Sequence, residues 1–305
     1  MTVRFLQHVA LAVPDPAVGR TFYQAFGLEA REEGRRIVMR CHGRDQDQMV
    51  LLEAPSRKLH HLCFGTRADL LPGLKRRIED CGVRLLDPPR EHPANGLWMR
   101  DPDGVLINVR EVEPAPALGG PEWRINTPGH YTRLGARGCP PRDTSVRPRR
   151  LGHTLRFTPG LDRQIDFYTR LLGLRLSDRA EDIVAFLHCE GGSDHHVLAF
   201  LKSDRPGFHH ASFEVANIDE IGFGASRLLD KGYGYGWGLG RHVLGSNFFF
   251  YIRDPWHGLA EYFCDIDYIP AGMKWDAQDW APQDALYAWG PKVPEDFGKN
   301  FETGG

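Results

Sequence analysis

Hydrophobic and polar residues alternate in short stretches that run into amphipathic helices, and this pattern occurs more than once along the chain. LQHVALAVPDP leads into a helical stretch containing FYQAFGLEA, and LGHTLRFTPG, which begins at Leu151, leads into one containing FYTRLLGLRL. Several short strands, separated by Gly, Pro and Asp turns, follow each helix. The pattern therefore predicts units of the order β-α-β-β-β.

The two halves of the chain carry the same landmarks in the same order. His8 precedes Phe22 by the same spacing as His153 precedes Phe167, so strand, helix and Phe-Tyr pair align without a gap. Further on, KLHHLCFGT matches GFHHASFEV, and MRDPDGVLINVRE matches IRDPWHGLAEYFC, whose DPWHG turn we expect to be one residue longer. An internal repeat of this kind predicts one domain in each half.

The repeat divides the chain into four segments and predicts an α+β fold. We expect a domain of two paired βαβββ modules over residues 1–111 and a second such domain over 151–265. Residues 112–150 are rich in proline and arginine, which favours an irregular linker on the surface. We expect the C-terminal extension, 266–305, to pack on the body, because it is rich in aromatic residues. Its tryptophans are Trp275, Trp280 and Trp289.

Composition excludes several classes of protein. The chain has 305 residues, of which 41% are hydrophobic and 26% charged, as in ordinary globular proteins. Its net charge of −2 offers no basic excess, so we expect no nucleic-acid partner. No apolar run is long enough for a membrane helix, and a proline interrupts the N-terminus too early for a signal peptide. The six cysteines form no C-x-x-C pair, so we expect reduced thiols and a cytoplasmic protein without membrane contact.

Residues that can bind metal recur at equivalent points of the repeat. In the second copy these points hold His153, the adjacent pair His209 and His210, and Glu261. Two imidazoles and one carboxylate form the facial triad that suits non-haem Fe(II), because it leaves the opposite coordination positions open. The pattern therefore predicts a metal site in the C-terminal domain.

The first copy has an incomplete set at the same points. They hold His8, His61 and Asn108. Because asparagine cannot supply the anionic ligand, we expect the N-terminal domain to be free of metal.

Other polar residues lie near the predicted ligands. If the DPWHG turn centres on Trp256, Tyr251 and Glu261 face each other across an antiparallel hairpin. His242 precedes this hairpin on a predicted glycine-rich loop, and a pair of histidines precedes the apolar strand VLAFL. Each of these residues also has a plain structural interpretation as a packed or solvated side chain. The pair consists of His195 and His196.

At these residues the sequence resembles the type I extradiol ring-cleavage dioxygenases of the vicinal oxygen chelate superfamily. The resemblance spans LQHVALAV to AEYF and rests on LGHTLRF, FHHASFEV and FFFYIRDPWHGLAEYF. It implies the fold of the glyoxalase, bleomycin-resistance and dioxygenase proteins. It also implies that His153, His210 and Glu261 hold Fe(II), or occasionally Mn(II). Strand register supports one ligand from the pair, because it would put His209 and His210 on opposite faces.

The resemblance also implies an activity and its catalytic residues. The acid/base histidine of the family corresponds to His196, with His195 as the alternative, and the residues that bind the substrate oxygen correspond to His242 and Tyr251. The substrates would be a catechol and O2, and the product a muconic semialdehyde-type compound. The resemblance further implies a homo-oligomer.

Two other functions compete with ring cleavage. One is a metal-dependent isomerase of the glyoxalase type, which needs no additional histidines and tyrosine beside the metal. The other is a metal-free small-molecule binding protein of the bleomycin-resistance type, which has no use for the His-His-Glu set. The sequence also leaves open whether four apolar residues near the site line a substrate pocket or belong to the core. These are Trp237, Leu244, Phe248 and Phe249.

Overall fold

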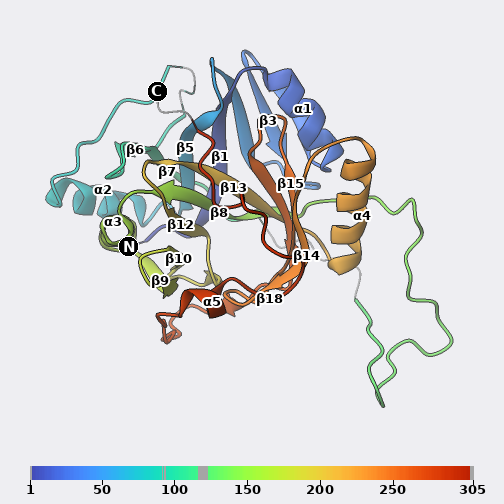
Figure 1. The fold of residues 1–305 in the computed structure, drawn as a ribbon. Helices are drawn as coiled ribbons and strands as arrows, with labels where there is room; N and C mark the ends of the chain where they lie inside the picture. Colours follow the sequence, from blue (N-terminus) through green and yellow to red (C-terminus); the bar gives the residue numbers. More distant parts are fainter. Residues whose placement is uncertain (1, 91, 93, 116–122, 303–305) are drawn as a thin grey trace.

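The computed structural model describes residues 2–90, 92, 94–115 and 123–302, and it contains two large mixed sheets (Figure 1). The N-terminal sheet has seven strands in the order β2-β3-β4-β1-β5-β7-β6. The C-terminal sheet has nine strands in the order β18-β14-β15-β16-β13-β8-β12-β10-β9. A separate pair joins β11 to β17. Among the described residues, no helix is long and apolar enough to cross a membrane.

The described residues of the N-terminal half form nine elements. They are β1 (Phe5–Val13), α1 (Pro16–Ala25), β2 (Glu29–Glu33), β3 (Arg36–Arg40), β4 (Met49–Glu53), β5 (Lys58–Thr66), α2 (Leu71–Asp80), β6 (Leu97–Arg100) and β7 (Leu106–Glu111). The C-terminal half is longer. Its elements are β8 (Arg150–Thr158), α3 (Leu161–Leu172), β9 (Leu174–Ala180), β10 (Val184–Cys189), β11 (Ser193–Asp194), β12 (Leu198–Lys202), β13 (Gly207–Glu214), α4 (Ile218–Asp230), β14 (Tyr235–His242), β15 (Phe248–Arg253), β16 (Leu259–Cys264), β17 (Tyr268–Ile269), α5 (Pro282–Ala285) and β18 (Tyr287–Trp289).

The pairing of strands repeats between the two halves. Strand β1 pairs in parallel with β4 and antiparallel with β5, which pairs in parallel with β7. Strand β8 pairs in the same way with β12 and β13, and β13 pairs in parallel with β16. The predicted α+β fold of paired modules is confirmed.

The second module differs from the predicted unit. Among the described residues after α2, it contains only the strands β6 and β7. An isolated bridge from Leu86 to Trp98 stands where the fourth module of the chain has a full strand, β14. Pro88 and Pro89 follow directly. Because proline has no backbone N–H, this stretch cannot continue a hydrogen-bonded ladder.

The two Asp-Pro turns have equal length, so the predicted extra residue in DPWHG is wrong. Asp101 Oδ1 accepts hydrogen bonds from the N–H groups of Asp103 and Val105, and Asp254 Oδ1 accepts from those of Trp256 and Gly258. The position of Gly104 (φ 83°) is taken in the second turn by His257, also left-handed (φ 67°). The glycine of the second turn, Gly258, lies one position later in its turn than Gly104 does in the first.

The segments outside the modules differ in how they pack. The described part of the linker holds one isolated bridge, Thr127 to His130, and residues 116–122 lie outside the described residues. The C-terminal extension packs on the second domain, as predicted. The indole N–H of Trp275 donates to the carbonyl of Ser177, and that of Trp280 donates to Asp178. Residues 303–305 lie outside the described part.

A buried ion-pair cluster joins the two domains. Arg156 on β8 contacts Asp101 at 2.5 Å and Asp103 at 2.9 Å, and all three side chains are fully buried. The ring of Phe26 also stacks on that of Tyr262 at a centroid distance of 3.8 Å. Because buried charges need their partners, the arginine ties the β6–β7 turn of one domain to the sheet of the other.

We expect Arg156→Met to lower the free energy of unfolding by about 3–5 kcal/mol, because it leaves the buried Asp101 carboxylate without an ionic partner and Asp103 with Arg163 alone. The matched control is Arg170→Met, which removes an exposed helical pair with Asp166 and should cost less than about 0.5 kcal/mol. Urea unfolding followed by circular dichroism measures both. Equal midpoints for the two variants would show that the buried cluster contributes no more than a surface pair.

Candidate active site

Strand register brings the three predicted metal ligands together. Ser212 on β13 pairs with His153 on one neighbouring strand and with Glu261 on the other. His210 lies two residues before Ser212, and side chains two apart on a strand point to the same face. The side chains of His153, His210 and Glu261 therefore share one face of the C-terminal sheet.

The ligand atoms converge at short distances. His153 Nε2 lies 3.1 Å and His210 Nε2 3.3 Å from Glu261 Oε2. One ligand atom from each residue falls within 4.8 Å of the other two, and all three residues are buried. His210 Nε2 is buried and makes no hydrogen bond among the described residues. A buried nitrogen of this kind has a lone pair available for a metal ion.

The neighbouring histidine sets the orientation of His210. A backbone carbonyl can only accept, so His209 Nε2, 2.7 Å from the carbonyl oxygen of Phe297, carries a proton. The Nδ1 of neutral His209 then accepts from His210 Nδ1–H at 2.7 Å. This arrangement leaves the lone pair of His210 on Nε2, toward Glu261. In metal sites, a hydrogen-bond partner on the other ring nitrogen orients a histidine ligand in the same way.

The predicted separation of His209 and His210 onto opposite faces is wrong. Both line the same cavity, and their ring centroids are 4.9 Å apart. The pairing of β13 with β8 is irregular between Phe208 and His210, so the simple alternation of side chains fails at His209.

His242 and Tyr251 lie beside the ligand set. Tyr251 pairs directly with Glu261 across the β15–β16 hairpin, as its alignment predicted. His242 is the last residue of β14 rather than part of a loop. Its Nδ1–H donates to the carbonyl of Leu286 at 2.7 Å, so its Nε2 accepts from the Tyr251 hydroxyl at 3.0 Å. Burial and the Glu261 carboxylate raise the pKa of Tyr251 well above its ordinary value, which keeps this donor protonated.

Of the pair before β12, His196 faces the site. It lines the cavity, and its ring centroid lies 4.3 Å from that of His153. Burial and the neighbouring histidines, His153 first, lower its pKa well below the ordinary value, so the ring is neutral at pH 7. His195 lies behind it and contacts Asp178 at 2.8 Å.

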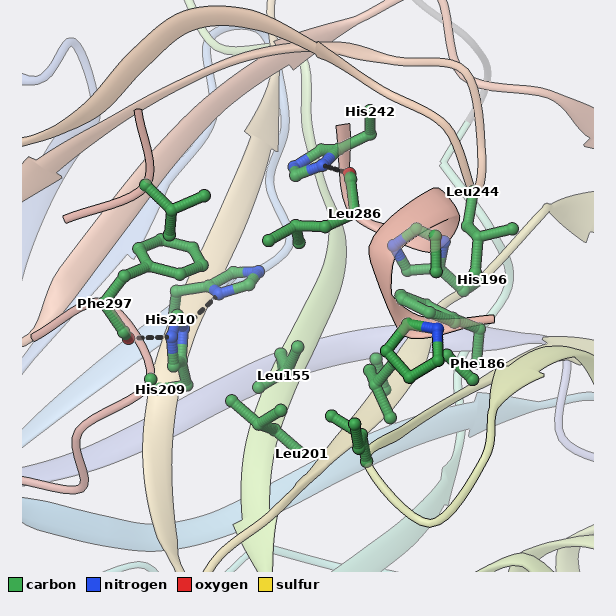
Figure 2. Close-up of a pocket in the computed structure, with 18 of the residues that line it drawn as sticks. Leu155, Phe186, His196, Leu201, His209, His210, His242, Leu244, Leu286 and Phe297 are labelled. Atoms are coloured by element: carbon green, nitrogen blue, oxygen red, sulfur yellow. Dashed lines mark hydrogen bonds between the residues drawn. The ribbon is translucent and has the colours of Figure 1, made fainter. Parts of the chain in front are cut away.

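An apolar cavity of about 280 Å³ opens over these groups. Figure 2 shows the imidazoles of His196, His210 and His242 around this space, with Leu155 and Leu201 on the side away from His242. Among the described residues that line it, none is Lys, Arg, Asp or Glu. The remaining lining residues are Ala180, Ile183, Val184, Phe186, Ala199, Leu244, Pro282, Ala285, Leu286, Val293, Phe297 and Gly298, together with His153, His209 and Tyr251.

Of the four apolar candidates from the sequence, only Leu244 lines the cavity. Phe249 instead stacks on the His242 ring at 4.0 Å and supports it from behind. Trp237 is buried, with its indole N–H on the carbonyl of Pro291, and Phe248 lies under Arg241. No motif indicated that the C-terminal extension would form one wall, because its contribution comes from scattered apolar side chains and backbone carbonyls.

The corresponding place in the N-terminal domain has a different character. His8 Nε2 lies 2.9 Å from His61 Nε2, and a third histidine, His92, completes a buried cluster. Asn108 donates to backbone carbonyls, and Arg36 donates to His92 Nδ1 at 3.1 Å. Burial, His92 and the guanidinium groups of Arg110 and Arg36 lower the pKa of His8 well below its ordinary value. Guanidinium groups beside neutral imidazoles, with no carboxylate in the cluster among the described residues, oppose the binding of a cation.

Comparison with known proteins identifies one relative over nearly the whole chain and another over part of it. A protein named "Metapyrocatechase 2" from Cupriavidus necator is 43% identical over 309 residues, which cover 99% of this chain and 93% of the relative. An "Iron-dependent extradiol dioxygenase" from Rhodococcus jostii is 30% identical over 155 residues, 46% of this chain and 50% of the relative.

A solved structure has the same fold, and a family profile matches both halves of the chain. The Mn(II)-bound glyoxalase from Novosphingobium aromaticivorans shares the fold with a TM-score of 0.75 at 23% identity, over 96% of this chain and 94% of that one. Residues 5–109 and 150–262 both match the profile of the "Glyoxalase/Bleomycin resistance protein/Dioxygenase superfamily". The profile thus covers both halves of the repeat, and the chain belongs to this superfamily.

Proposed function

We propose that this protein is a non-haem Fe(II)-dependent extradiol dioxygenase, which cleaves the ring of a catechol with O2 to a muconic semialdehyde-type product. The observation that carries the proposal is the buried His-His-Glu set, within 4.8 Å, whose two histidines line an apolar cavity together with His196, His242 and Tyr251. The names of the two relatives, a metapyrocatechase and an extradiol dioxygenase, support it.

The metal would be held by His153, His210 and Glu261. Two imidazole nitrogens and a carboxylate suit Fe(II), with Mn(II) as the alternative, and the unpartnered His210 Nε2 fits this role. Bound there, the ion would supply Lewis acidity, open coordination positions and electron exchange with O2. We propose that residues 1–111 bind no metal, because Asn108 replaces the carboxylate and Arg36 and Arg110 lie beside the histidines.

The remaining polar residues would act on the substrate. His242 and Tyr251 already share a hydrogen bond beside Glu261, where they can hold a substrate oxygen. His196 is neutral and lines the cavity, so it can accept a proton from the catechol and return it later in the reaction. We assign this role to His196 rather than His195, because His195 is not among the described residues that line the cavity and its Nδ1 contacts His196 Nδ1.

The cavity favours an uncharged ring substituent. Its apolar walls offer no cation to a carboxylate, and an unpaired buried charge costs several kcal/mol. We further propose that the enzyme acts in the cytoplasm as a homo-oligomer on a small catechol and O2, without nucleic acid or membrane partners. The six free cysteines support a reducing compartment.

Glu261→Gln should weaken Fe(II) binding by at least about 100-fold, because loss of even an outer partner costs metal sites 10–100-fold. The variant keeps the shape of the side chain and removes its charge. Metal content after anaerobic reconstitution and desalting measures the effect. The control is Glu214→Gln on the same sheet, which should retain one ion per chain. A full equivalent of iron in Glu261→Gln would exclude the carboxylate as a ligand.

His196→Phe should retain iron and lower kcat for ring cleavage by about 100-fold or more, because it removes the proposed acid/base group. Steady-state kinetics with iron-reconstituted protein provide the test, and His130→Phe, an exposed histidine of the linker, is the control. Unchanged kcat in the His196 variant would reject its catalytic role.

The cavity predicts a preference among catechols. We expect kcat/KM for 4-methylcatechol to exceed that for 3,4-dihydroxybenzoate by at least about 100-fold, because the carboxylate finds no charged partner. The two compounds differ only at one ring position, so their comparison isolates the substituent. Equal values would mean that the substituent lies outside the cavity.

A further inference from the structure

Two buried residues behind His196 form a continuous hydrogen-bonded chain with it. Asp178 Oδ2 lies 2.8 Å from His195 Nε2, and His195 Nδ1 lies 3.1 Å from His196 Nδ1. All three residues are buried, and the chain ends at the cavity. Neither Asp178 nor the contact between the histidines has a role in the function proposed above.

The protons in this chain can be placed one after another. Burial tends to raise the pKa of Asp178, but hydrogen bonds from His195, the Gln278 N–H and the Trp280 indole outweigh it and lower that pKa, so the carboxylate is ionised. A carboxylate only accepts, so His195 Nε2 carries a proton. With a single N–H on His195, at Nε2, its Nδ1 is an acceptor, and His196 donates to it from Nδ1.

The consequence appears at the cavity. A neutral imidazole has one N–H, so His196 Nε2 keeps its lone pair. No hydrogen bond joins this nitrogen to a described residue. The other ring nitrogen of His196, Nδ1, is hydrogen-bonded to His195. His196 therefore presents a base rather than an N–H donor to whatever occupies the cavity.

We propose that Asp178 and His195 are positioning residues that determine which ring nitrogen of His196 carries its proton, and that they thereby keep Nε2 ready to accept a proton from the substrate. This inference rests on the proposed function, in which His196 is the acid/base group. The chain corresponds to the way a buried aspartate selects a histidine tautomer in serine proteases.

Asp178→Asn should reverse the direction of the hydrogen bonds that run from position 178 through His195 to His196. Asp178 Oδ1 accepts from the Gln278 N–H at 2.8 Å and from the Trp280 indole at 3.2 Å, so an asparagine would keep its oxygen there. Its NH2 group would then face His195 Nε2, which must become an acceptor. His195 would donate from Nδ1, and the proton of His196 would move to Nε2.

The test reads the tautomers directly. The full-length chain is labelled with ¹⁵N-histidine and loaded with Zn²⁺, which is diamagnetic and accepts nitrogen and oxygen ligands. Two-bond ¹H–¹⁵N couplings distinguish protonated from unprotonated ring nitrogens, and His195→Gln and His196→Gln variants assign the resonances. Wild-type protein should show His196 protonated at Nδ1, and Asp178→Asn should show it protonated at Nε2. The kcat of Asp178→Asn should fall by about 100-fold or more, with its metal content unchanged.

Two further variants separate this role from a structural one. Asp182→Asn makes the same chemical change at an exposed carboxylate paired with Lys202, and should alter neither tautomer nor kcat. Trp280→Phe weakens the contact between the extension and Asp178 but leaves the carboxylate, so the wild-type tautomer should persist.

Several results would overturn the inference. One is a wild-type His196 protonated at Nε2, which needs no variant to be observed. Another is an Asp178→Asn protein with the wild-type tautomer, or with a loss of kcat no greater than that of Trp280→Phe. Because the tautomers are read without turnover, the expected spectra in a protein that cleaves no catechol would reject the proposed function and leave the proton placement standing.

Discussion

The chemistry of the site depends on hydrogen-bond acceptors that lie outside it and orient its histidines. The carbonyl of Phe297 acts through His209 on His210, the carbonyl of Leu286 acts on His242, and Asp178 acts through His195 on His196. In each case an atom that can only accept places a proton on one ring nitrogen and leaves the other with its lone pair. Without these acceptors the same side chains would present either tautomer to a metal or substrate.

The C-terminal extension supplies most of this control. It provides the carbonyls of Leu286 and Phe297, and it holds Asp178 through Gln278 and Trp280. It also closes the cavity with apolar side chains, and exclusion of water strengthens each polar contact inside. The two repeated domains place the ligands by strand register, and the extension converts that placement into an oriented site.

Part of this structure could be predicted from the sequence because it depends on repetition and strand period. The repeat located His153 and Glu261 at equivalent points, and hairpin alignment placed Tyr251 opposite Glu261, as observed. The irregular pairing at His209 could not be predicted, because no residue type requires a bulge there. The roles of Leu286 and Phe297 were also missed, since they act through backbone carbonyls that every residue possesses.

For a related reason, the sequence left open whether the nearby aromatic residues line the cavity or belong to the core. Phe249 and Trp237 lie close to the site in sequence, but their rings pack around His242 and Tyr251 rather than line the cavity. The position of a residue in the sequence indicates the strand to which it belongs, but not whether its side chain lines the cavity or packs in the core. The cavity walls instead combine the sheet surface with an extension that is far from the ligands along the chain.

The most direct test of ring cleavage is oxygen consumption by protein reconstituted anaerobically with Fe(II) and supplied with 4-methylcatechol. We expect O2 uptake to require both iron and the catechol, with one O2 consumed for each molecule of yellow ring-fission product formed. Protein that binds one iron per chain at Glu261 but consumes no O2 with any catechol would contradict it, and would favour a metal-dependent isomerase of the same superfamily.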